Sequence, residues 1–232
     1  MKNLFYKELK LSLHPLCYVL VALLSTEALS PGIPGGINFL YTTVIYTMLF
    51  IGVNKAASTN DLFYTLNLPI RKKDVVKARL ISVAFLQIAM FILTFGFLLI
   101  TELVFIPGIK ATNPAQLEGA IDGIGATQGI AFLGVGLLTY AFADTAYFLI
   151  YYKTGKSIVL ATLISPFVAL ACAFAFDVLP VVIFGLDAFT VGSANANYFL
   201  QFAFLIVGAA LYAGSRFFIT NKCGKYLENL DF

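Results

Sequence analysis

Charged residues are scarce in this 232-residue chain, where Asp, Glu, Lys and Arg make up 12% and hydrophobic residues 60%. A soluble globular domain carries about 25% charged residues and about 45–50% apolar ones. Together with a mean hydropathy of +0.90, this composition excludes a water-solvated monomer and predicts a polytopic membrane protein. Because each crossing needs roughly 20 mostly apolar residues, the chain has room for about six crossings and for no sizeable soluble domain.

The chain is equally poor in residues that commonly bind metals or perform catalysis. His14 is the only histidine, and the three cysteines, Cys17, Cys172 and Cys223, lie far apart in the sequence. A histidine-based metal site and a Ser-His-Asp triad are therefore excluded, and the cysteine spacing indicates no disulfide framework. We expect a protein that is not an enzyme and that holds no cofactor of its own.

Apolar runs of membrane-spanning length recur along the chain, separated by polar or helix-breaking segments. They predict crossings at residues 15–29, 37–53, 80–105, 128–152, 158–176 and 198–215. The predicted fold is accordingly all-α, a single membrane domain over residues 1–232 with six transmembrane helices. The apolar run at 178–186 is too short to span, so residues 177–197 are predicted to form an extracellular re-entrant or interfacial segment.

Lysine and arginine fall almost entirely on one side of this six-crossing arrangement. Fourteen of them lie on the side that holds both termini, and only Lys110 lies on the other. Because cytoplasmic loops of membrane proteins carry the excess of Lys and Arg, both termini are expected in the cytoplasm. Residues 1–13 are themselves basic, and Phe5 and Leu9 are spaced for one helix face, which predicts an interfacial helix.

Asp144 is the ionisable residue expected deepest in the membrane, eight residues before the end of the fourth predicted crossing at Tyr152. A charge at that depth is costly and is a functional candidate, but a structural hydrogen bond between helices explains it equally well. No Lys or Arg partner is expected for it, which argues against a proton pump. Tyr140 and Tyr147 on the same crossing either face lipid or line a substrate cavity, and Gly134 is expected to allow a close helix contact.

Residues 54–79 form the most polar part of the chain, yet apolar side chains recur within it. Asn60 or Asp61 can cap a short helix in which Leu62 and Leu66 share one face. This would be an amphipathic helix at the cytoplasmic surface. It would either rest on anionic lipid or dock a soluble partner, and the residues alone leave both interpretations open.

The layout resembles that of the ABC-2 type permeases, which have a basic N-terminal elbow helix, six crossings and a coupling helix in the first cytoplasmic loop. The run LNLPIRKKDVV at residues 66–76 is similar to the s-L-P-v-s-R-k-e-i-v run of small bacterial members. The broken apolar segment before the last crossing is similar as well. The chain departs from the pattern at Asn60-Asp61, where many relatives have a glutamate.

The resemblance implies the permease subunit of an ATP-driven exporter in the cytoplasmic membrane of a bacterium, similar to exporters of phenol-soluble modulins and antimicrobial peptides. ATP and Mg would bind a separate ATP-binding subunit. The other partners would be a second permease copy, the bilayer and an amphipathic or peptide substrate, with no nucleic acid. The residues expected to dock the ATP-binding subunit are Asn60, Asp61, Leu62, Tyr64, Leu66, Arg71 and Lys72, and those expected in the substrate cavity are Asp144, Tyr140 and Tyr147.

Two other functions stay open at this point. One is an ion- or proton-coupled carrier, which would use Asp144 as its coupling group. The other is a non-transporting immunity or scaffold protein of the same architecture. The residues do not identify the cargo or the interface between two permease copies.

Overall fold

The computed structural model of the chain describes residues 2–12, 16–26, 70–100, 103–104, 106–112, 130–154, 158–175 and 197–228. These residues are helical almost throughout, and no β-strand occurs among them, so the all-α prediction is confirmed for this part of the chain. Several predictions lie outside the described residues. They are the crossing at 37–53, the segment 177–196 and the docking residues Asn60, Asp61, Leu62, Tyr64 and Leu66.

The described helices are α1 (Lys2–Lys7), the π-helix η1 (Glu8–Ser12), α2 (Leu16–Ser25), α5 (Lys72–Ile100), α6 (Ile106–Thr112), α8 (Ile130–Thr154), α9 (Ile158–Ala173) and α11 (Tyr198–Glu228). Three of them are long and apolar enough to cross a membrane, within Lys72–Phe97, Ala131–Lys153 and Tyr198–Glu228. A helix rises 1.5 Å per residue, so a hydrocarbon core of about 30 Å needs about 20 residues. These three helices indicate a membrane protein.

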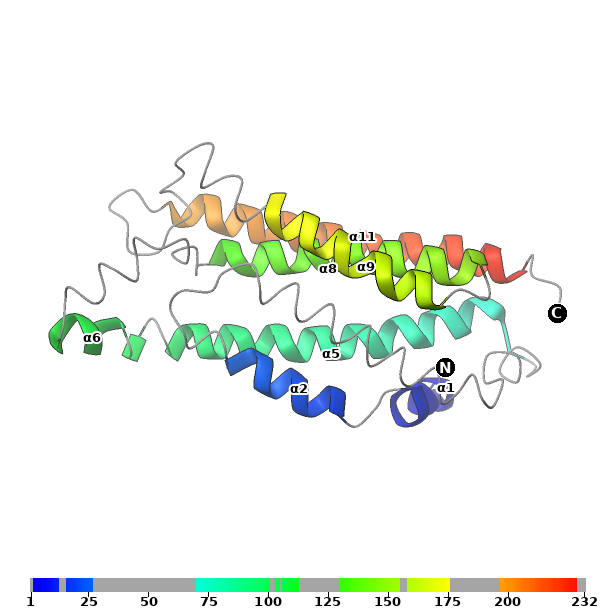
Figure 1. Ribbon diagram of the computed structural model, residues 1–232, viewed down its shortest axis with the longest axis horizontal. Helices are drawn as coiled ribbons and strands as arrows, with labels where there is room; N and C mark the ends of the chain where they lie inside the picture. Colours follow the sequence, from blue (N-terminus) through cyan, green and yellow to red (C-terminus); the bar gives the residue numbers. More distant parts are fainter. Residues whose placement is uncertain are drawn as a thin grey trace.

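The long helices lie side by side, and both chain ends lie at one end of the bundle (Figure 1). The start of α5 and the last turns of α8 and α11 lie at that same end, which we call the terminal end. Helix α8 contacts both α9 and α11, and α11 also contacts α5. Helices α1, η1 and α2 pack on α5. The arrangement therefore brings segments from the beginning, middle and end of the chain together at the terminal end.

Helix α8 is the central helix of the bundle. In its most apolar stretch 67% of the residues are buried, compared with 39% in α5 and 17% in α11. Its backbone comes very close to that of α11, because a Cβ atom built on Gly208 would lie only 2.6 Å from the carbonyl oxygen of Gly134. Small residues permit such approach in membrane helices, and the predicted close contact at Gly134 is confirmed.

Helix α11 extends beyond its predicted end. The sixth crossing was predicted to end at residue 215, where the apolar run stops, but the helix continues to Glu228. Ile219, Cys223 and Leu227 are buried in this extension, since residues four apart lie on one helix face. The exposed lysines give the part of α11 after Ser215 a polar composition, although one face of this part is packed in the core.

Helix α5 begins at Lys72, eight residues before the predicted start of the third crossing at residue 80. The Asp74 amide donates to the Arg71 carbonyl oxygen at 2.8 Å, and an acidic side chain in the first turn complements the helix dipole. Residues 72–79 of the predicted loop are therefore helical. Of the two described docking candidates, Arg71 is exposed and Lys72 is partly buried.

Candidate functional site

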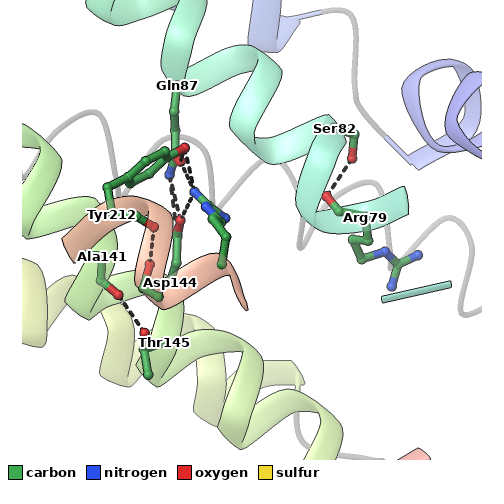
Figure 2. A network of polar contacts seen from close by, with 9 residues as sticks. Arg79, Ser82, Gln87, Ala141, Asp144, Thr145 and Tyr212 are labelled. Atoms are coloured by element: carbon green, nitrogen blue, oxygen red, sulfur yellow. Dashed lines mark hydrogen bonds and ion pairs between the residues drawn. The ribbon is translucent and has the colours of Figure 1, made fainter. Parts of the chain in front are cut away.

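Asp144 lies at the centre of a buried polar network formed by α5, α8 and α11 (Figure 2). Its two carboxylate oxygens accept hydrogen bonds from the Gln87 side-chain amide at 3.2 and 3.1 Å. Arg216 of α11 forms an ion pair with it. Tyr212, one turn before Arg216, donates its hydroxyl to the Gln87 side-chain oxygen at 2.8 Å. We call these four residues the inner network.

The inner network is almost completely removed from water. Asp144 is fully buried, and the Arg216 side chain is only 15% exposed. The Nη2 atom of Arg216 contacts Asp144, Gln87 and the Tyr212 hydroxyl, while its guanidinium carbon lies 4.5 Å from the centre of the Tyr212 ring. A buried charge costs several kcal/mol unless it is well paired, so these contacts hold the three helices in one arrangement.

The expectation that Asp144 has no Lys or Arg partner is wrong. Arg216 was counted among the cytoplasmic cations because the apolar run ends at Ser215, but it lies well inside α11 and reaches back to α8. One signal in the sequence could have found it. Tyr212 and Arg216 are four residues apart, with no proline and only Gly214 as a weak helix breaker between them, and this spacing places both on one face of a continuing helix.

The depth of the network follows from helix geometry. Asp144 precedes Lys153, at the end of the apolar part of α8, by nine residues. At 1.5 Å per residue, this separation is about 13 Å along the helix. The inner network therefore lies more than two helical turns inside the apolar part of α8. An ionisable group this deep in an apolar helix is a functional candidate.

Tyr140 and Tyr147 flank Asp144 along the same face of α8, four residues before it and three after it. Both are buried in the protein, so neither faces lipid. Tyr147 lies edge-on to Phe148 and stacks on Tyr151, and all of them belong to the main core cluster. That these two tyrosines line a substrate cavity stays a prediction.

A second buried charge pair lies nearer the terminal end, and Figure 2 shows its arginine to one side of the inner network. Arg79 of α5 donates through Nε to the Glu8 carboxylate of η1 at 3.0 Å. Its Nη1 donates to the Tyr151 hydroxyl of α8 at 3.1 Å. Arg79 and Glu8 are both buried, although Arg79 was expected at the cytoplasmic surface. We call Glu8 and Arg79 the outer pair.

The chemistry available to these groups is that of charge and hydrogen bonding. No three His, Cys, Asp or Glu side chains gather to hold a metal ion within the described ranges. Paired charges at membrane depth can hold helices together, receive a polar group of a cargo, or take up and release a proton. In comparison with known proteins, the chain matches no family model, no curated protein and no solved structure. A function can therefore be inferred only from these residues and from the resemblance to the ABC-2 type permeases.

Proposed function

We propose that this chain is the membrane-embedded permease subunit of an ATP-driven exporter, of the six-crossing kind that its sequence resembles. The three long apolar helices support a membrane location. The gathering of both chain ends and the start of α5 at one end supports a common cytoplasmic side for them (Figure 1). The other crossings, the elbow and coupling helices, the bacterial cytoplasmic membrane and a second permease copy are parts of the proposal.

The observation that carries the proposal is the outer pair. Glu8 belongs to the basic N-terminal segment. Arg79 lies two turns into α5, the helix that begins at Lys72 just after the predicted cytoplasmic loop. Separating two buried charges leaves each without compensation and costs several kcal/mol. The N-terminal segment and the start of α5 therefore move together, as an exporter needs when a force applied at the cytoplasmic surface must reach crossing helices.

In this proposal the chain itself is not catalytic. ATP and Mg bind the separate ATP-binding subunit, which docks on the loop that includes Leu62 and Tyr64, with the exposed Arg71 beside it. Closure of two such subunits rocks the two permease copies between inward- and outward-facing states. The cargo is an amphipathic or apolar molecule such as a peptide, and it moves outward.

The test is purification of the tagged chain in mild detergent from its native cells, followed by mass spectrometry of co-eluting proteins. A stoichiometric ATP-binding protein is expected with the wild type and with Lys225→Asp, a control at an exposed residue of the terminal end. The double variant L62D/Y64D is expected to lose that protein, because charges do not fit an apolar groove. A wild type that elutes alone, under conditions that keep a known ABC complex intact, would refute the proposal.

The Asp144–Arg216 ion pair favours a second candidate, an ion- or proton-coupled carrier. Intramembrane charge pairs of this kind occur in proton relays. A carrier would move cargo in ATP-free vesicles when a proton gradient is imposed, and Asp144→Asn would abolish that movement. Cargo movement that needs ATP and continues in the Asn variant would remove this candidate, whereas no transport of any kind would leave a scaffold or immunity role.

A further inference from the structure

The part of α11 beyond Arg216, residues 217–228, is packed against the rest of the bundle and is not a free tail. Ile219, Cys223 and Leu227 belong to the same core cluster as buried residues of α5 and α8. The Cys223 thiol also lies 3.5 Å from the Phe148 carbonyl oxygen, to which it donates. We call residues 217–228 the α11 extension.

The α11 extension touches the first turn of α5 at one close point. A Cβ atom built on Gly224 would lie 2.5 Å from Cγ of Lys73 and 3.2 Å from its Cε. The aliphatic part of Lys73 therefore lies flat on the α11 backbone, and a side chain at position 224 would push it away. Gly214, on the same helix, has nothing within 4 Å of such an atom.

Helices α5 and α11 thus contact each other at two levels. One is the Lys73–Gly224 contact at the terminal end, and the other is the inner network, where Gln87 meets Tyr212 and Arg216. The 14 residues from Lys73 to Gln87 correspond to about 21 Å of helix. Two helices held at points this far apart cannot slide or tilt past each other without breaking one contact.

We infer that α5, α8 and α11 move as one rigid unit. When the segment before α5 pushes on the start of that helix at Lys72, the α11 extension transmits the movement to the inner network. Packed interiors deform little under load, and the ion pair with Asp144 ties α8 to the other two helices. This inference rests on the proposed function, since that function supplies the displacement.

The first test locks the contact. In a chain whose Cys17, Cys172 and Cys223 are alanine, Lys73→Cys and Gly224→Cys place two thiols close enough to pair, since the new sulfur on α5 would stand near the present Cγ position of Lys73. We expect oxidation to link them and ATP hydrolysis by the co-purified ATP-binding subunit to keep its rate. A linked form that retains that subunit but stops hydrolysing ATP would overturn the inference, because α5 and α11 must then slide.

The second test forces the contact apart. Gly224→Leu is expected to lower permease-stimulated ATP hydrolysis about tenfold by overpacking, with the ATP-binding subunit still bound, whereas Gly214→Leu changes neither. Full hydrolysis in Gly224→Leu overturns the inference, and so does loss of the bound subunit, which would make the extension a docking surface. If Gly224→Leu does not fold, the cross-link decides, because it adds little volume.

A wild type without any ATP-binding subunit refutes the proposed function itself, before any variant is made, and the inference with it.

Discussion

The two arginines that form ion pairs with buried carboxylates are held in different ways. Arg79 divides its contacts, with Nε on Glu8 and Nη1 on Tyr151. Arg216 directs Nη2 alone to its partners, and its Nε and Nη1 are buried without a hydrogen bond to any residue that the structure describes. Arg79 thus spreads its contacts over η1 and α8, while Arg216 joins α5, α8 and α11 through one nitrogen atom.

This difference separates two tasks. The outer pair holds the N-terminal segment on α5, so its loss is expected to loosen the structure at the terminal end. The inner network joins α5, α8 and α11 within their apolar parts, so its loss is expected to destabilise the whole bundle. Changes to the two sites are therefore expected to differ both in the size of their effect on stability and in the region of the protein that they loosen.

The largest effect is expected from Arg216→Met, which leaves the Asp144 carboxylate buried without its cation. Such a change lowers the free energy of unfolding by about 3–5 kcal/mol. The measurement is the temperature at which the purified protein loses its monodisperse peak on size-exclusion chromatography. The double variant D144L/R216M removes both charges and is expected to recover most of that loss. An Arg216→Met protein as heat-resistant as the wild type would show that the ion pair does not stabilise the bundle.

A smaller and more local effect is expected from Glu8→Gln. The amide still accepts one hydrogen bond from Arg79, so the buried guanidinium keeps a polar partner but loses its counter-charge. The cost is therefore expected to be smaller than when a buried charge is left with no partner at all. Hydrogen–deuterium exchange of residues 2–12 should rise, with α8 and α11 unchanged. Lys10→Gln, at an exposed position of η1, is the matched control and should change neither. Faster exchange throughout the bundle would contradict the division between the two sites.

The smallest effect is expected from removal of one hydroxyl at each site. Tyr212→Phe and Tyr151→Phe each lose hydrogen bonds worth about 0.6 kcal/mol on average between membrane helices. Since the two hydroxyls contact different residues, Arg79 for one and Gln87 with Arg216 for the other, the double variant should show the sum of the two losses in the same heating experiment. A clear departure from that sum would mean that the outer pair and the inner network act as one.

The sequence predicts the positions of helices better than their lengths. The fourth crossing was expected at 128–152, and α8 runs over Ile130–Thr154, because its apolar run has sharp polar boundaries. The start of α11 at Tyr198 was also predicted, but its end was not. Hydropathy reports the part of a helix that lipid surrounds. Helix α11 continues beyond its apolar run because it packs against α5 and α8, and the sequence of α11 alone gives no information about that packing.

The site was predictable only in part for a similar reason. Asp144 stands out because a carboxylate in an apolar run is costly wherever the helix points. Its partner depends on how α11 is rotated and placed 72 residues further along the chain. Glu8 was missed because its neighbours in the N-terminal helix give no sign of burial, and the pairing with Arg79 spans 71 residues.

The contact between Gly134 and Gly208 closes the space between α8 and α11. The two backbones lie so close there that not even a methyl group fits between them. Nothing can pass laterally between α8 and α11 at that level, and no lipid tail can enter the seam. Under the proposed function, the cargo would therefore cross along another side of the bundle, because α8 and α11 leave no space for it between them.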